Sequence, residues 1–161
     1  MTPSSVYEKA ILPALAILQM DAGPRPVTML LAIGLQESLL RFRRQHNNGP
    51  ARGLWQFERG GGVRGVLRHA ATKQRAFELC AARSVRPEEM AVWTALEIDD
   101  TLAAGFARLL LWSDAAPLPP LNATGLAWAY YMRNWRPGKP KPEKWPENWK
   151  TAVEFVQGLE S

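Results

Sequence analysis

Apolar residues recur along most of the chain at every third or fourth position, which is the spacing of one face of an α-helix. The alternation of apolar and polar residues that is typical of strands is nearly absent. The predicted helices span residues 4–20, 26–42, 63–69, 73–82, 87–99, 102–112, 124–133 and 145–158. No internal repeat interrupts the series, so the pattern predicts a single all-α domain over residues 1–161.

The helix predicted over residues 26–42 is apolar on nearly every side and contains one acidic residue, Glu37. Because neighbours must pack around such a helix, we expect it at the centre of the domain. Burial raises the pKa of a carboxylic acid, and an acid that keeps its proton near neutral pH can protonate the leaving oxygen of a glycoside. The alternative is a solvated Glu37 that forms an ion pair with Arg41, four residues further on.

The helical pattern breaks between residues 45 and 62, where glycine, asparagine and proline indicate an irregular segment with tight turns. This segment contains Gly53-Leu54-Trp55-Gln56 and the glycine run 60–62. Glycine lets the backbone pass close to a sugar ring, and glutamine offers both a donor and an acceptor to an N-acetyl group or a hydroxyl. The alternative for Gly53–Gln56 is a turn into a buried strand.

Two motifs together resemble the signature of the goose-type lysozyme and soluble lytic transglycosylase superfamily. They are Glu37-Ser38 near the end of a buried helix and, some fifteen residues on, Gly53-Leu54-Trp55-Gln56, in which Trp55 replaces the commoner methionine. The superfamily also has a late tyrosine that hydrogen-bonds the catalytic glutamate, and Tyr130 and Tyr131 are both candidates for it. The blocks 56–62 and 134–140 resemble small phage-encoded proteins of this type.

The resemblance implies a lysozyme-like helical domain with an irregular glycine-rich loop after its central helix. It implies cleavage of the β-1,4 bond between N-acetylmuramic acid and N-acetylglucosamine in peptidoglycan, with Glu37 as the general acid and no cofactor. The expected substrate-binding residues are Ser38, Gly53, Leu54, Trp55, Gln56, Tyr130 and Tyr131. Trp128 and Trp135 flank this site in the sequence and could stack on sugar faces, as could Trp55.

A second carboxylate would decide the mechanism, and Glu58, two residues beyond Gln56, is the best-placed candidate. Inverting hydrolases place such a base across the sugar from the acid. The alternative is an exposed Glu58 paired with Arg59 or Arg64. Lytic transglycosylases of the superfamily manage with one glutamate and release an anhydro sugar, so hydrolysis and transglycosylation both stay open.

The net charge of +5 and the pI of about 9.7 favour a polyanionic partner, such as nucleic acid, acidic lipid or an anionic cell wall. The single cysteine, Cys80, lies in an apolar helical pattern, so we expect its side chain to be buried. His46 and His69 lack the spacing of metal ligands, so we expect no metal.

The apolar run 10–20 is too short to span a bilayer, and Glu8 and Pro13 are untypical of a signal peptide. We therefore expect no membrane insertion and no export signal. The protein would stay in a host cytoplasm until a holin releases it to the wall, or would be carried in a virion. The expected partner is the peptidoglycan glycan strand, and we expect the protein to be a monomer.

The competing hypothesis is a non-catalytic basic helical protein that belongs to a virion or binds nucleic acid. Nucleic-acid binding calls for Arg and Lys along one recognition helix. Here Arg41, Arg43 and Arg44 cluster at a helix end beside the proposed site, which argues against it.

Overall fold

The structure is a computed structural model that describes residues 1–161, and it contains helices and no strands. Two isolated β-bridges join Arg52 to Arg44 and to Phe57. The elements in chain order are α1 (Pro3–Val6), η1 (Tyr7–Ile11), α2 (Leu12–Leu18), α3 (Pro24–Ser38), η2 (His46–Asn48), η3 (Arg59–Val63), α4 (Arg64–Arg68), α5 (Lys73–Ala82), α6 (Glu89–Leu96), α7 (Asp100–Trp112), α8 (Thr124–Trp135), η4 (Pro142–Lys144) and α9 (Trp145–Leu159). The predicted all-α class is confirmed.

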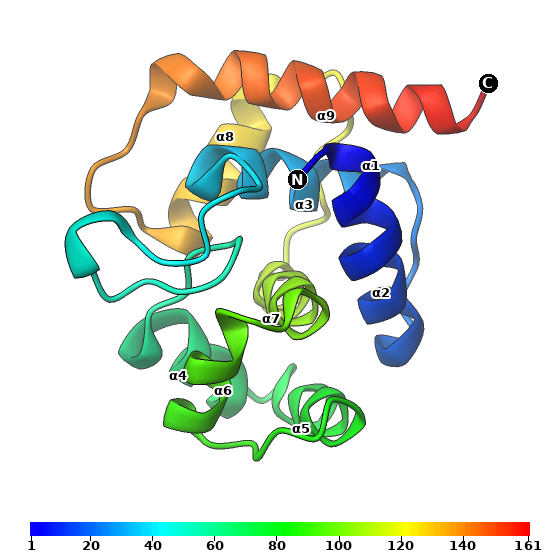
Figure 1. Ribbon diagram of the computed structural model, residues 1–161. Coiled ribbons are helices and arrows are strands. Elements are labelled where there is room, and N and C mark those ends of the chain that lie inside the picture. The colour runs from blue at the N-terminus through cyan, green and yellow to red at the C-terminus, as the bar shows by residue number, and fades with distance from the viewer.

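Helix α3 lies inside the fold, with α9 packed along it and α7 crossing nearby (Figure 1). Its residues from Pro26 to Gly34 are all buried. This burial agrees with the prediction of a central helix made from its apolar surface. The second helix that is buried on most sides is α7, whose first turn is capped by the Asp99 side chain, which accepts a hydrogen bond from the Leu102 amide at 2.9 Å.

The first predicted helix, over residues 4–20, is one continuous helical segment made of α1, η1 and α2. Its middle turn, η1, is a wider π-helical turn just before Pro13. Proline has no amide hydrogen, so the Lys9 carbonyl, four residues earlier, loses its usual donor. The Thr101 hydroxyl of α7 donates to that carbonyl instead, at 3.2 Å.

Helix α3 ends at Ser38, and the prediction that it continues to residue 42 is wrong. Leu39 and Leu40 both have left-handed backbone angles, with φ of 58° and 53°. This turn places Leu40 in the core and leaves Leu39 exposed. The amides of Leu39 and Leu40 bond to carbonyls of the last helical turn, as in other left-handed helix ends.

The irregular segment after α3 runs from residue 39 to 58, so it begins and ends earlier than the predicted range of 45–62. The glycine run 60–62 lies in the helical turn η3, which leads directly into α4. The interior is one continuous apolar cluster to which most helices contribute. None of the helices combines the length and apolar character that crossing a bilayer requires.

Candidate active site

Glu37 lies in the last turn of α3, with its carboxyl partly buried against α8. The hydroxyl of Tyr131, from α8, donates a hydrogen bond of 2.7 Å to Oε1 of Glu37. Burial raises the pKa of Glu37 to about 7, and the smaller opposing effect of the Tyr131 hydrogen bond limits that rise. Glu37 therefore holds its proton over part of the neutral range, as a general acid requires.

The alternative ion pair between Glu37 and Arg41 is not formed. No ion pair of Glu37 lies within 4.0 Å, and the Arg41 guanidinium sits 5.2 Å from the centre of the Phe42 ring. The left-handed turn at Leu39 and Leu40 breaks the helical spacing that would have placed Arg41 one turn beyond Glu37. Glu37 therefore has a neutral hydrogen-bond donor as its partner, and this leaves its proton available.

Tyr130 and Tyr131 have different surroundings, although they are neighbours in the sequence. The hydroxyl of Tyr130 shares its one hydrogen between the backbone carbonyls of Leu111 and Ala116, each 3.1 Å away, and forms no hydrogen bond with Glu37. The ring of Tyr131 stacks on Trp145, with 5.3 Å between ring centres and planes 9° apart. Tyr131 is the tyrosine of the site, and Trp145 fixes its ring.

The Ser38 and Gly53–Gln56 motifs fasten the irregular segment to α3. The Ser38 hydroxyl donates to the Leu54 carbonyl at 2.6 Å, and the indole nitrogen of Trp55 donates to the Leu30 carbonyl at 2.8 Å. The indole nitrogen of Trp135 in turn donates to the carbonyl of Trp55 at 2.9 Å. These bonds hold the loop against the end of the helix that carries Glu37.

Several residues expected to touch the substrate are buried instead. The side chains of Ser38, Leu54, Trp55, Tyr130 and Tyr131 are at most 4% exposed, and the Tyr131 hydroxyl is bonded to Glu37. Their polar atoms are already bonded within the protein, so direct contact of these side chains with a sugar was a wrong expectation. They form part of the protein interior beneath the site. Trp128 and Trp135 are half-buried and also pack against Tyr131.

The backbone conformation and the contacts within the protein, rather than contact with a sugar, account for the glycine at position 53. Its φ is +80°, a conformation that other residues rarely adopt, and a Cβ placed there would lie 2.8 Å from the Leu96 carbonyl oxygen. Gln56 is half-buried with φ of 52°, and its Nε2 donates to the Gly53 carbonyl at 3.0 Å. Its Oε1 has no bonded partner and is available to accept a hydrogen bond from a ligand.

Glu58 is exposed, as its alternative reading expected, but the ion pair with Arg59 or Arg64 is not formed. Arg64 pairs with Glu89 instead, through bonds of 2.8 and 3.0 Å. Glu58 lines a small hollow of about 70 Å³ with Gln56 and Trp135. It also lines a larger hollow of about 400 Å³, whose other residues are Pro50, Arg59, Gly60, Met90 and Trp93. Glu37 itself lines neither hollow.

No group of three or more His, Cys, Asp or Glu side chains is close enough to hold a metal ion. Cys80 is buried, and burial raises the pKa of its thiol to about 11, so it does not act as a nucleophile near neutral pH.

Comparison of the chain with known protein families, with curated proteins and with solved structures finds no match. Function is accordingly inferred from the chemistry of the site and from the motifs that form it.

Replacing Tyr131 by phenylalanine should move the alkaline limit of activity to higher pH. The Tyr131 hydrogen bond lowers the pKa of Glu37, so its loss raises that pKa, and the protonated, active form persists further into the alkaline range. The maximal rate should fall at least about tenfold, because the carboxylate formed after proton transfer loses its donor. The measurement is the pH dependence of cleavage of purified cell walls, the activity that the sequence motifs lead us to expect.

Tyr130→Phe is the matched control for this prediction. It removes the neighbouring hydroxyl, whose bonds go to the carbonyls of Leu111 and Ala116, and should cost about 1 kcal/mol of stability. Its pH profile should equal that of the wild type. Equal shifts of the profile in both variants would show that Tyr131 has no specific effect on Glu37.

Proposed function

We propose that this protein cleaves the β-1,4 bond between N-acetylmuramic acid and N-acetylglucosamine in peptidoglycan, as a muramidase or a lytic transglycosylase. The observation that carries the proposal is the Glu37 carboxyl, with its pKa raised to about 7 and the Tyr131 hydroxyl 2.7 Å from Oε1. A proton held near neutral pH is what the leaving oxygen of a glycoside needs. The resemblance of Glu37-Ser38 and Gly53–Gln56 to the superfamily signature supports this choice of substrate.

In the first step the proton of Glu37 passes to the glycosidic oxygen while the bond from that oxygen to C1 of N-acetylmuramic acid breaks. Glu37 becomes a carboxylate, and the hydrogen bond that Tyr131 donates to it becomes a stronger, charge-assisted one. Gln56 can hold a hydroxyl or an amide of the sugar through its free Oε1.

In the second step C1 forms a new bond to oxygen in one of two ways. In hydrolysis a water adds to C1 and passes its proton to a base, for which Glu58 is the candidate. In transglycosylation the 6-hydroxyl of the same sugar adds to C1 and its proton returns to the Glu37 carboxylate, which leaves a 1,6-anhydro end. In transglycosylation Glu37 recovers its proton directly. In hydrolysis Glu58 ends protonated and Glu37 ends ionised, and proton exchange with the solvent restores both groups.

Clearing of a suspension of purified cell walls tests the proposed function against its non-catalytic alternative. The net charge of +5 favours association with an anionic wall under either hypothesis, so binding alone does not separate them. We expect the turbidity of the suspension to fall with time in proportion to enzyme concentration. A constant turbidity with bound protein would favour a non-catalytic basic protein.

Glu58→Gln tests the hydrolytic route. With Glu58 as the base, we expect the rate to fall about 10²-fold and the wild-type products to carry reducing muramic ends. The carboxylate is free for this role because it has no ion-pair partner and lines the hollow that Gln56 also lines. Mass spectrometry of the released glycans distinguishes reducing ends from anhydro ends.

Glu88→Gln is the control, because Glu88 is also an exposed acid without an ion pair. It should leave the rate and the products unchanged. An active Glu58→Gln variant whose products carry 1,6-anhydro ends would contradict the role of Glu58 and assign both proton transfers to Glu37.

A further inference from the structure

The connection between α8 and α9, residues 136–144, concentrates positive charge that the protein itself does not neutralise. It holds four exposed cations and one acid, Glu143. The cations are Arg136, Lys139, Lys141 and Lys144, and none of them has an ion-pair partner within 4.0 Å. In contrast, seven arginines elsewhere form ion pairs with carboxylates within the same distance: Arg43, Arg44, Arg52, Arg64, Arg68, Arg83 and Arg133.

This segment is attached to the helix that carries the catalytic acid. Gln36, the neighbour of Glu37 in α3, donates from Nε2 to the Lys141 carbonyl at 3.0 Å. The other end of the Gln36 amide accepts a hydrogen bond of 2.8 Å from Asn148 of α9. The bond from Gln36 therefore fixes the Lys141 backbone against the last turns of α3, the helix that carries Glu37.

The far end of the segment is held by the same aromatic group that holds Tyr131. Trp145 follows the segment directly, stacks on Tyr131, and donates from its indole nitrogen to the Thr124 carbonyl at 3.0 Å. Three prolines, at 137, 140 and 142, restrict the backbone between these attachments. Because the segment is ordered in advance, it loses little conformational entropy when it binds a ligand.

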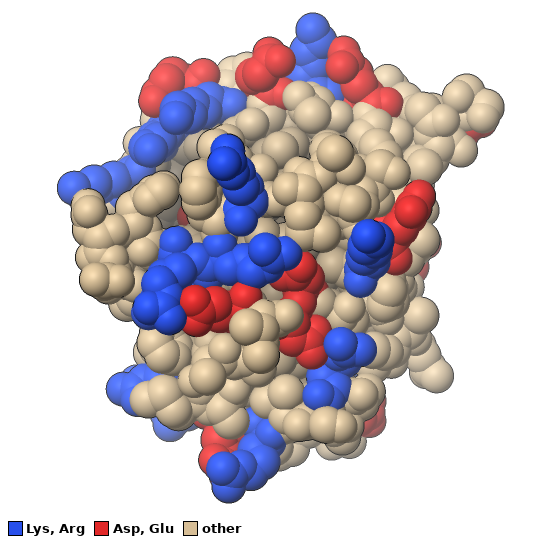
Figure 2. Space-filling view, in the orientation of Figure 1, with Lys and Arg blue, Asp and Glu red and all other residues tan.

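A further unpaired cation follows the end of α3, the helix to which this segment is attached. Arg41, just beyond the end of α3, is exposed and has no acidic partner. In Figure 1 the segment between α8 and α9 passes beside the end of α3. In the same orientation, Figure 2 shows a hollow in this part of the surface with Lys and Arg side chains on several sides of it.

We propose that residues 136–144, together with Arg41, form a basic rim that binds the anionic groups of the wall polymer and so positions the glycan strand over Glu37. This inference rests on the proposed function. The ligands are carboxylates or phosphates, since both pair with lysine and arginine through charge-assisted hydrogen bonds. In a wall the carboxylates belong to the peptide stems, and the phosphates belong to polymers attached to the glycan.

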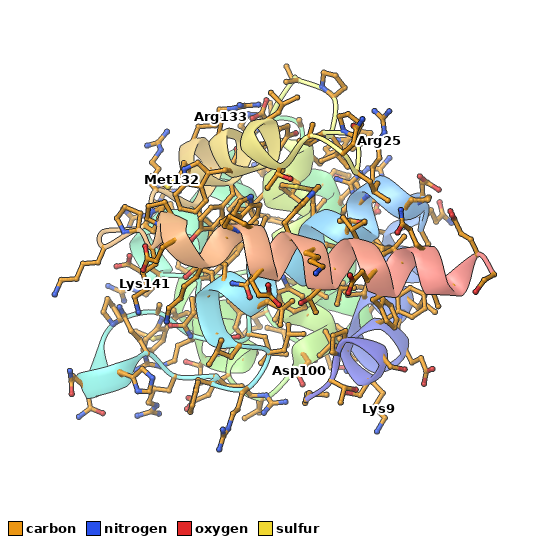
Figure 3. All side chains as sticks on the ribbon, turned by 90° about the horizontal axis from the view of Figure 1, so that it is seen from above. Lys9, Arg25, Asp100, Met132, Arg133 and Lys141 are labelled. Atoms are coloured by element: carbon orange, nitrogen blue, oxygen red, sulfur yellow. The ribbon has the colours of Figure 1, made fainter.

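The test compares two double variants that remove the same charge from different places. Lys139→Gln with Lys141→Gln alters the rim, and Lys9→Gln with Lys73→Gln removes two exposed, unpaired lysines elsewhere. Lys9 and Lys141 lie on opposite sides of the molecule (Figure 3). Both variants change the net charge from +5 to +3, because each removes two positive charges.

Binding is measured by sedimentation with purified walls, with Glu37→Gln present in every protein so that no wall is cut during the experiment. The rim variant should bind about 5- to 10-fold more weakly than its parent at low salt. This difference should shrink as the salt concentration rises. The control variant should bind within about twofold of the parent, as expected when only long-range charge is lost.

Three treated wall preparations identify the source of the anions. If the ligands are carboxylates, the difference between parent and rim variant disappears on walls freed of peptide stems by an amidase. If they are phosphates, it disappears on walls from which the phosphate polymers were extracted. On glycan freed of both groups no difference should remain, and a difference that persists there would contradict the proposal.

Equal binding of the parent and the rim variant to complete walls would overturn the proposal, and so would an equal loss in the control variant. The binding measurement does not require activity. If the rim variant binds as tightly as its parent while the wild-type protein still clears the walls, only the basic rim is contradicted and the proposed function stands. If the protein binds walls through the rim but the wild-type protein never clears them, the result would count against the proposed function.

Discussion

Replacing Glu37 by glutamine should lower the rate of wall cleavage by about 10²- to 10⁴-fold and leave the protein folded. Glutamine has nearly the same shape as glutamic acid but cannot transfer a proton to the leaving oxygen. It can still accept the hydrogen bond from Tyr131 through its amide oxygen. The rate is measured by the release of dye from labelled walls.

The stability of the Glu37→Gln variant should exceed that of the wild type increasingly as the pH rises. The folded protein holds the Glu37 proton up to a pKa of about 7, whereas the unfolded chain releases it near the ordinary pKa of 4.5. Between these two values the folded state binds more protons, so the wild type loses stability as the pH rises. Glutamine has no proton to lose there.

The measurement is the difference in melting temperature between the two proteins from pH 4 to pH 8. All other titrating groups are common to both proteins and cancel in the comparison. The difference should be near zero at pH 4 and should grow in favour of the variant up to about pH 7. Retained cleavage by the variant, or a difference that does not depend on pH, would show that Glu37 is not a desolvated general acid.

Gly53→Ala should be the most destabilising of the small substitutions in the motifs, at about 2–4 kcal/mol. Two costs add at this position. An alanine at φ of +80° is strained, and its Cβ would lie 2.8 Å from the Leu96 carbonyl oxygen, which belongs to helix α6 and cannot move freely. The loop carrying Gln56 should shift as a result, so activity should fall together with stability.

Gly65→Ala is the matched control, because a Cβ at Gly65 meets nothing within 4 Å and the residue lies in α4. Alanine favours the helix over glycine, so this variant should be unchanged or more stable by up to about 1 kcal/mol. Chemical denaturation measures both variants. A Gly53→Ala protein as stable as the wild type would show that the loop tolerates a side chain there.

The central place of α3 could be predicted from its sequence, but its end could not. Residues 26–34 are apolar on nearly every side, and a helix of that kind has to be surrounded by other elements. Leu39 and Leu40 also read as helix, because leucine is a good helix former. Their left-handed turn depends on contacts far away in the chain: Leu40 fills the core, and Ser38 bonds to the Leu54 carbonyl.

The residues of the site could be predicted in part, because motif and spacing show which residues come together but not how they face. Adjacent residues of a helix point about 100° apart, so the rotation of α8 against α3 decides whether Tyr130 or Tyr131 meets Glu37. Trp55 carries a polar indole nitrogen, yet the Leu30 carbonyl satisfies it inside the core. Gln36 and Trp145 gave no linear signal beyond one polar residue in an apolar helix and one tryptophan at a helix start.

The identity of the soluble products from purified peptidoglycan tests the central claim most directly. We expect the wild-type protein to release disaccharides that still carry their peptide stems, with the cut on the N-acetylmuramic acid side, as seen by mass spectrometry. The Glu37→Gln variant should release almost none at the same concentration. Release of free peptides, of sugars cut at the other glycosidic bond, or of the same products by the variant would contradict the account.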